Sequence, residues 1–445
     1  MSSLSLANLQ RCIPVVTAFV VVLATSGCGQ PRTDVANDIG VDAGDLVDAG
    51  TFDPGTFDAG GPVDGGEVEP DGGAEPDGGS DVDAGVTEDA GPASVAVGHA
   101  HTCALTAAGG VKCWGSNDVG QLGTGTNPPS LQPADVIGLT SGVVSVSAGA
   151  QFTCALTSAG GVKCWGYNDA GRLGDGSTTN RREPVDVVGL STGVRQLITG
   201  WAHACALTAA GGVKCWGQNL DGELGDGTEV SRFEPVDVIG LTSGVVQVTA
   251  RGTHTCALSV GGGVKCWGAN AVGQVGDGTR DERTAPVDVN GLSSGVEQIS
   301  AGTVHTCALL SEGGVKCWGH NTFGQLGNGA NTNSLVPVDA VNLPTEIAQL
   351  ALGGHHTCVL TAAGGAKCWG FNHSGQLGDG STTDRSQPVD VSGLTSGVTQ
   401  LAPGVSHGCA RMIDGGVKCW GWGEEGQLGD GSTGQSLTPV DVAGL

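Results

Sequence analysis

Short segments in which apolar and polar residues alternate recur along most of this chain. Around Cys154, residues 143–147 read Val-Val-Ser-Val-Ser, the alternation typical of a strand with one buried face. We expect further short strands over residues 152–157, 162–166 and 184–187, separated by glycine-rich turns. No segment shows a sustained helical period. Four short strands without a helix predict one antiparallel β-sheet.

This four-strand pattern recurs seven times at a constant spacing. A Cys-Trp-Gly tripeptide ends the third predicted strand of each unit, and its cysteine advances by 51 residues every time. Seven glycine-rich units of about fifty residues predict a ring of seven β-blades. The seven cysteines are Cys113, Cys164, Cys215, Cys266, Cys317, Cys368 and Cys419.

A second cysteine precedes each of these by ten residues, in the second predicted strand. If Cys154 faces Cys164 across the hairpin, then Leu156 faces Val162, which gives a matched apolar pair. Facing residues of antiparallel strands lie within disulfide reach. One cysteine pair with such a gap does not match the spacing of structural zinc sites. We therefore expect the disulfides Cys103–Cys113, Cys154–Cys164, Cys205–Cys215, Cys256–Cys266, Cys307–Cys317, Cys358–Cys368 and Cys409–Cys419.

Histidine stands two residues before the first cysteine in six of the seven units, and Phe152 stands there in the other. A seven-membered ring would hold these histidines too far apart to share one metal ion. We expect them to make hydrogen bonds at the start of the second strand. They are His101, His203, His254, His305, His356 and His407.

The units resemble the regulator of chromosome condensation repeat family. In the first unit the matching residues are His101-Thr102, Ala104-Leu105, Trp114-Gly115, Asn117 and Gly120-Gln121-Leu122-Gly123. The resemblance covers residues 94–445. It implies an all-β fold, a seven-bladed β-propeller with four-stranded antiparallel blades. It also implies that strands from the two ends of the chain share one blade, with residues 439–442 joined to residues 94–97.

The first 28 residues have the pattern of a secretory signal, with an apolar run over residues 13–24 followed by small residues. Cys28 follows Ser-Gly and resembles the lipidated cysteine of bacterial lipoproteins, although that family usually has Leu where this chain has Thr25. The alternative is an ordinary secreted protein in which Cys28 is incidental. We expect an exported protein at the bacterial outer membrane or cell surface; a periplasmic or secreted location is the alternative.

Residues 29–93 consist mainly of Asp, Gly, Ala and Pro, with 17 acidic residues against the single Arg32. Such a segment has too little apolar surface to order itself, so we expect a disordered, extended spacer. The formal charge of −26 divides into about −16 here, −11 in the repeats and +1 in the first 28 residues. An acidic body argues against binding nucleic acid through its phosphates.

Aromatic residues that interrupt the repeat are candidate binding residues. The position between Trp-Gly and Asn varies from unit to unit, and the third unit has a tryptophan after the glycine that precedes its second strand. Aromatic residues on loops are frequent anchors of binding surfaces. The alternative is that they fill gaps between blades. These candidates are Tyr167, Trp201, His320, Phe371 and Trp422.

Arginines also interrupt the repeat. Eight of the ten arginines in the repeats lie between Arg172 and Arg283. Several share the variable loop before the last strand, where they would form a basic patch for an acidic partner or a polysaccharide. The alternative is solvated loop charge. The candidates are Arg181, Arg182, Arg232, Arg280 and Arg283.

We expect a monomeric, non-enzymatic binding module for an unknown protein or glycan, tethered at the cell surface by its lipid anchor, with no cofactor or metal. The constant 51-residue period leaves no insertion from which to build a catalytic pocket. The acid pairs Asp281-Glu282 and Glu424-Glu425 are neighbours on loops. The alternatives are an inhibitor or partner of a secreted enzyme, and an exported glycan-acting hydrolase.

Overall fold

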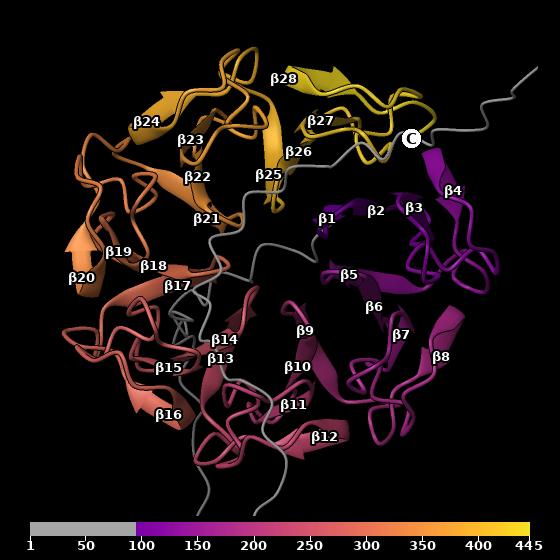
Figure 1. The fold of residues 1–445 in the computed structure, drawn as a ribbon, viewed down its shortest axis with the longest axis horizontal. Coiled ribbons are helices and arrows are strands. Elements are labelled where there is room, and N and C mark those ends of the chain that lie inside the picture. The colour runs from indigo at the N-terminus through magenta and orange to yellow at the C-terminus, as the bar shows by residue number, and fades with distance from the viewer. Residues whose placement is uncertain (1–94) are drawn as a thin grey trace, which may run out of the picture. The chain divides into compact units, whose positions relative to one another are not determined.

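The computed structural model describes residues 95–445, which form seven four-stranded sheets arranged as the blades of a ring (Figure 1). Every helix or strand assigned in these residues is a β-strand. Within residues 95–445 there is no helix long and apolar enough to cross a membrane. The predicted signal over residues 1–28, its Cys28, and the predicted spacer over residues 29–93 lie outside the described residues.

The innermost strand of each blade lies nearest the axis of the ring, and the second strand pairs with it (Figure 1). The inner strands are β1 (Val95–Val97), β5 (Val143–Ala148), β9 (Val194–Thr199), β13 (Val245–Ala250), β17 (Val296–Ala301), β21 (Ile347–Leu352) and β25 (Val398–Pro403). The second strands are β2 (His101–Leu105), β6 (Phe152–Thr157), β10 (His203–Thr208), β14 (His254–Ser259), β18 (His305–Leu310), β22 (His356–Thr361) and β26 (His407–Met412).

The third strand carries the Cys-Trp-Gly tripeptide, and the fourth forms the outer edge. The third strands are β3 (Val111–Gly115), β7 (Val162–Gly166), β11 (Val213–Gly217), β15 (Val264–Gly268), β19 (Val315–Gly319), β23 (Ala366–Gly370) and β27 (Val417–Gly421). The outer strands are β4 (Ser130–Asp135), β8 (Arg181–Asp186), β12 (Arg232–Asp237), β16 (Arg283–Asp288), β20 (Ser334–Asp339), β24 (Arg385–Asp390) and β28 (Ser436–Asp441).

The predicted all-β propeller with seven four-stranded antiparallel blades is therefore confirmed. In the second blade the first three strands fall where the alternation predicts them. The outer strand begins at Arg181, three residues before the predicted start, because Arg181 pairs with Gly166 beyond an irregularity in the ladder.

The predicted closure of the ring is wrong. Every blade consists of four consecutive strands, and no blade contains strands from both ends of the chain. β1 is the innermost strand of the first blade, whereas β28 is the outermost strand of the seventh. The two strands therefore belong to complete sheets of their own. The first and seventh blades meet through side chains and through one backbone hydrogen bond, from the N–H of Gly431 to the carbonyl oxygen of Leu131 at 3.2 Å.

The central hairpin of each blade has the predicted register. Cys154 is paired with Cys164, and Leu156 with Val162. All seven expected cysteine pairs form disulfides across their hairpins. Each disulfide is buried, so it both cross-links the hairpin and contributes apolar surface to the core.

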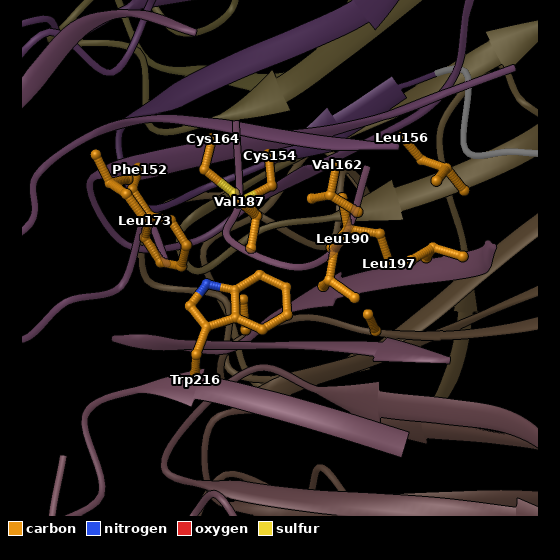
Figure 2. Close-up of a cluster of buried hydrophobic side chains, with 13 residues drawn as sticks. Phe152, Cys154, Leu156, Val162, Cys164, Leu173, Val187, Leu190, Leu197 and Trp216 are labelled. Atoms are coloured by element: carbon orange, nitrogen blue, oxygen red, sulfur yellow. A yellow bond between two sulfur atoms is a disulfide. The ribbon is translucent and has the colours of Figure 1, made fainter. Parts of the chain in front are cut away.

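The hydrophobic core lies between neighbouring blades. Figure 2 shows Trp216 of the third blade beneath the Cys154–Cys164 disulfide of the second blade, beside Val187. Its indole nitrogen donates a hydrogen bond to the carbonyl oxygen of Arg172 at 3.1 Å. The same contact joins each of the other six neighbouring pairs: Trp114 to Gln427, Trp165 to Gln121, Trp267 to Glu223, Trp318 to Gln274, Trp369 to Gln325 and Trp420 to Gln376.

A second contact between blades uses the histidines at the start of the second strand. Nε2 of His101 lies 2.9 Å from Oγ1 of Thr153 in the next blade. That hydroxyl donates to the carbonyl oxygen of Gln121, so the histidine nitrogen is the donor to the threonine. The pair recurs as His203–Thr255, His254–Thr306, His305–Thr357 and His407–Thr102. Five of the six predicted histidines therefore make the expected hydrogen bond.

Candidate binding face

Two sets of loops lie side by side at one end of each blade. In the first blade, the backbone N–H of Ser116, just after the third strand, donates to the carbonyl oxygen of Ala100, just after the inner strand, at 2.9 Å. The other six blades repeat this bond. We call this end of the propeller the loop face; it comprises residues 98–100, residues 116–129 and their equivalents. The five predicted aromatic candidates all lie on it.

The first aromatic cluster lies near the axis of the ring. The ring of His99 is 5.4 Å from that of Trp201 and 6.2 Å from that of Trp422, so side chains of the first, third and seventh blades meet there. Trp201 remains 36% exposed, whereas Trp422 is half-buried. Burial lowers the pKa of His99 below its ordinary value of 6.5. The structure therefore brings two of the predicted residues together around a histidine that sequence analysis missed.

The second aromatic cluster joins the fifth and sixth blades. Phe371 lies 4.6 Å from Phe323 and 4.5 Å from His373, measured between ring centroids. His320 packs edge-on against His355 at 5.7 Å, and its Nδ1 accepts a hydrogen bond from the side-chain amide nitrogen of Gln325 at 2.7 Å. Both predicted members, His320 and Phe371, are half-buried among these neighbours. This cluster fits the gap-filling alternative better than it fits a free anchor.

Tyr167 lies apart from both clusters. The guanidinium of Arg172 stacks over its ring, 4.6 Å from the centroid. Arg172 is 5% exposed and also forms an ion pair with Asp169. A hydrogen bond with Asp169, followed by the charge of that carboxylate, raises the pKa of Tyr167 above its ordinary value of 10.0. One face of the tyrosine is thus covered by its own blade.

Three of the five candidate arginines are paired within their own loops. Arg232 binds the carboxylate of Asp226 at 2.7 Å, and the Asp226 side chain is only 8% exposed. Burial alone would raise the pKa of Asp226, but hydrogen bonds from Thr228 and Arg232 outweigh it and lower that pKa. The equivalent pairs are Arg181–Asp175, Arg283–Asp277 and Arg385–Asp379. Each of these arginines joins the two ends of its loop, and the paired aspartate largely neutralises its charge.

The two remaining candidates are exposed. Arg280 donates to the carbonyl oxygen of Ala271 at 3.3 Å. Arg182 lines a shallow groove between the first and second blades together with Asp118 and Glu183, so acidic groups accompany it. The predicted basic patch is therefore reduced to two arginines in different blades, and their binding role stays a prediction.

Arg251 was not among the binding residues predicted from the sequence. It follows the inner strand β13 at a position that is glycine in the other six blades: Gly98, Gly149, Gly200, Gly302, Gly353 and Gly404. Its Nη2 atom donates to the carbonyl oxygen of Pro403 in the seventh blade at 2.6 Å. A small cavity at the axis, which we call the axial cavity, is lined by Arg251, His99, Trp201 and Val405, with glycine backbone between them. The signal in the sequence was the single missing glycine.

Other chemistry on the described residues is limited. The acid pairs Asp281-Glu282 and Glu424-Glu425 are exposed on loops. Across residues 95–445, no three side chains of His, Cys, Asp or Glu are arranged to hold a metal ion. What the loop face offers is aromatic surface, the half-buried Arg251 and neutral imidazole, which suits recognition of another molecule.

Comparison with known proteins adds a family likeness. Residues 74–394 match the RCC1-like domain, and residues 398–427 and 414–445 match the regulator of chromosome condensation (RCC1) repeat. The chain is 32% identical over 348 residues to the ultraviolet-B receptor UVR8 of Arabidopsis thaliana, covering 76% of this chain and 79% of the receptor.

Two further likenesses differ in extent. The chain is 33% identical over 327 residues to the human E3 ubiquitin-protein ligase HERC2. This match covers 71% of this chain but only 7% of the ligase. The crystal structure of human WBSCR16 superposes with a TM-score of 0.62 at 26% identity, covering 70% of this chain and 84% of that one.

Proposed function

Because the chain belongs to the family of RCC1-like β-propellers, we propose that its described domain is a non-enzymatic module that binds a protein partner through the loop face. RCC1-like propellers are a family of protein-interaction modules. The observation that carries the proposal is the exposure of Trp201 beside the axial cavity. A partly exposed tryptophan held by aromatic neighbours is a typical anchor for a partner, because it buries a large surface at little entropic cost.

The loop face is favoured because the blades differ there. The second and third strands, in contrast, place mostly the same groups in every blade. Each third strand, for example, presents a lysine to an aspartate of the outer strand, as in Lys265–Asp288 at 2.6 Å. Such repeated, solvated ion pairs give a partner no means of choosing one blade over another. Trp201, Trp422 and Arg251 are each found in one blade only at their positions, so they supply the asymmetry that specific recognition requires.

A non-enzymatic role is supported by the regularity of the scaffold. The 51-residue period is kept in every blade, so no loop is enlarged into a lid or a pocket wall. The acid pair Asp281-Glu282 is exposed, and burial against apolar groups is what usually prepares a carboxylic acid for glycan hydrolysis.

The location that we propose is the bacterial outer membrane or cell surface. The sequence of residues 1–28 supports export, and Cys28 supports a lipid anchor followed by an acidic spacer. Seven disulfides suit an oxidising compartment outside the cytosol. We propose a monomer that does not bind nucleic acid, since the propeller carries a formal charge of −11.

Site-specific photo-crosslinking tests the proposed binding face. The full-length chain is produced in oxidising conditions with a photo-reactive phenylalanine analogue replacing Trp201 or Trp422, and is exposed to envelope and secreted proteins of the native cells. A matched control carries the analogue at Val260, which is 78% exposed in the turn between β14 and β15, at the opposite end of its blade.

We expect a saturable adduct with one protein from position 201 or 422, absent from position 260 and competed away by the unmodified chain. An adduct that forms equally from Val260, or none from either loop-face position, would refute the proposed face. If the captured protein is a secreted enzyme that loses activity in the complex, the inhibitor alternative is the correct one.

A further inference from the structure

The third blade presents a pair of exposed aliphatic side chains on the loop face. Leu220 and Val230 lie in the loop between β11 and β12, and they are 64% and 58% exposed. At the same two positions the other six blades have polar or charged residues, alanine, proline or glycine. Single exposed aliphatic residues are common on protein surfaces, whereas neighbouring ones indicate an interaction site. We call Leu220 and Val230 the apolar patch.

The buried side chain of Asn219 makes the two residues of the apolar patch neighbours. Its nitrogen donates to the carbonyl oxygen of Val230 at 3.2 Å, and Leu220 is the next residue along the chain. Its oxygen accepts a hydrogen bond from the N–H of Leu224 at 2.9 Å, so the amide also fixes the inner part of the loop. The apolar patch therefore lies on an ordered loop, and a partner that binds it loses little affinity to ordering that loop.

Trp201, the proposed anchor, belongs to the same blade. It lies in the loop between β9 and β10, where the carbonyl oxygen of Ala202 accepts a hydrogen bond from the N–H of Gln218 at 2.9 Å. The loop with the apolar patch therefore begins directly beside the loop with Trp201. The exposed large apolar side chains of the loop face are Trp201, Leu220 and Val230, so all three belong to the third blade.

Acidic residues accompany the apolar patch. Residues 218–231 contain four acidic residues and no basic residue, more acids than any of the six equivalent loops. Asp226 is paired with its arginine, and Glu223 is buried. Asp221 is half-buried and Glu229 is exposed, and neither forms an ion pair with residues 95–445. Lys or Arg side chains of a partner would be attracted to these two carboxylates.

We propose that the apolar patch and Trp201 bind a segment of the partner protein in which apolar side chains are flanked by Lys or Arg. The apolar side chains would cover the patch and the indole, and the cations would face Asp221 and Glu229. This inference rests on the proposed function, because it names the part of the loop face that binds and the chemistry of the bound segment.

The charge of the chain favours this occupant over two others. The propeller carries a formal charge of −11, which attracts a basic segment at long range. Residues 29–93 of the same chain carry about −16, so their charge opposes binding at an acidic loop. A second copy of the propeller would bring the same negative charge to the contact.

Selection of peptides on the full-length oxidised chain tests the inference. The probe is a displayed library of random short peptides; selected sequences are synthesised, and their affinities are measured by fluorescence anisotropy. The main variant is Leu220→Thr with Val230→Thr, which leaves the charge unchanged. It installs the residues that the fifth blade has at these positions, Thr322 and Thr332, so the loop can accommodate them.

Two further variants separate charge from apolar contact. Asp221→Asn with Glu229→Gln removes both unpaired carboxylates of the loop and keeps the apolar patch. Val260→Thr is the matched control, since Val260 is an equally aliphatic, exposed residue at the opposite end of its blade.

We expect the selected peptides to combine aliphatic or aromatic residues with adjacent Lys or Arg. Their affinity should fall at least about tenfold in the double threonine variant, because their apolar side chains lose the surface that they bury. It should fall about threefold in the charge variant at low ionic strength, and less in high salt. Val260→Thr should bind like the native chain. Near-ultraviolet circular dichroism verifies each fold; if the double threonine variant is misfolded, Leu220→Thr alone decides.

Selected peptides without this composition, no selected peptide at all, or unchanged affinity in a folded threonine variant would overturn the proposal. So would a native dimer that the threonine substitutions dissociate in sedimentation equilibrium, because the patch would then bind a second copy. A partner crosslinked from position 201 or 422 whose binding does not need the apolar patch leaves the proposed function standing and removes this inference. Peptides that discriminate between native chain and variant, without any crosslinked protein, do the reverse: the peptide site stands and the proposed protein partner is removed.

Discussion

Oγ1 of Thr102 in the first blade lies 2.9 Å from Nε2 of His407 in the seventh, across the one blade interface that no linker spans. The interfaces at which this pair is missing are equally informative. Phe152 replaces the histidine where the next blade has Ala204, so both polar partners are lost together. His356 is different: the equivalent residue of the next blade is Gly408, and neither of its ring nitrogens has a hydrogen-bond partner.

We predict that Gly408→Thr stabilises the protein. The new hydroxyl would accept from His356 and donate to the carbonyl oxygen of Gln376, as the equivalent threonines do elsewhere. Two added buried hydrogen bonds correspond to a gain of about 1–2 kcal/mol in the free energy of unfolding. A Cβ atom at Gly408 would lie 3.2 Å from Trp420, and Thr102 is accommodated in the same register against its own tryptophan.

The measurement is the midpoint of urea unfolding, with Gly408→Val as the control of the same shape. Val also removes the flexibility of glycine but adds no hydroxyl. Equal stabilisation by Val and Thr would show that the hydrogen bonds are not the cause.

We predict that buried histidines make the propeller less stable in acid. Burial lowers the pKa of His203 to about 3 from its ordinary value of 6.5. Between these values the unfolded chain binds a proton that the folded chain does not, so the stability contribution is complete above pH 6.5 and is lost as the pH falls toward 3. At pH 4.5 each such histidine costs on the order of 2 kcal/mol.

The double variant His203→Phe with Thr255→Ala, which copies the Phe152–Ala204 interface, should take up about one proton fewer on unfolding. The quantity to measure is the slope of the unfolding free energy against pH between 6.5 and 3. An unchanged slope would exclude His203 as a contributor to acid sensitivity.

Removing one disulfide should destabilise the propeller without changing its fold. For Cys256→Ala with Cys266→Ala, the closed loop in the unfolded chain is lost, and so is packing against Trp318 of the next blade. We expect a loss of about 2–4 kcal/mol. Urea unfolding followed by tryptophan fluorescence measures it, and the native chain in reductant should show a larger loss. An insensitive native chain would contradict the structural role of the cysteines.

The two kinds of ion pair should differ in energy. Arg232 pairs with a buried carboxylate, that of Asp226, whereas Lys265 pairs with Asp288, whose side chain is 82% exposed. Arg232→Met leaves Asp226 buried with less compensation and should cost about 1–3 kcal/mol. Lys265→Met should change stability by less than about 0.5 kcal/mol. Equal effects in thermal or urea unfolding would mean that the arginine is not needed to hold its loop.

Cys28→Ser should release the protein from the membrane. If Cys28 is lipidated, the native chain incorporates labelled palmitate in a bacterial host and sediments with the outer membrane, whereas the variant does neither. Both chains should be recovered with intact propeller disulfides. Membrane association that survives in the variant would point to an ordinary signal and a different means of attachment.

Periodicity was enough to predict the architecture, but not how the ring closes. The 51-residue spacing and the facing cysteines Cys154 and Cys164 determine blade number and hairpin register, because both depend on local pattern. A constant spacing gives the length of the repeat, but it does not show at which strand each blade begins. Residues 94–97 and 439–442 both alternate as strands should, and only the pairing of complete hairpins assigns them to separate sheets.

The candidate site was predicted in part for a similar reason. Interruptions of the repeat led to Trp201 and Trp422, but the aromatic criterion missed His99, which occupies the same repeat position as Trp201 and lies between the two. The arginine criterion favoured Arg232 because it ignored Asp226, six residues earlier. It left out Arg251. That residue is unusual because it replaces a glycine found in the other six blades, and a search for clustered charge does not detect such a replacement.

The contact between Trp114 and the seventh blade has a consequence for the order of events during synthesis. The tryptophans of the other six Cys-Trp-Gly tripeptides each pack beneath a disulfide that precedes them in the chain, so their binding place is made before it is needed. Trp114 packs beneath Cys409–Cys419, which is made some three hundred residues later. The first blade must therefore wait with one apolar side uncovered until the last blade arrives. The growing chain has a period of vulnerability to aggregation and proteolysis that ends only when its final blade emerges.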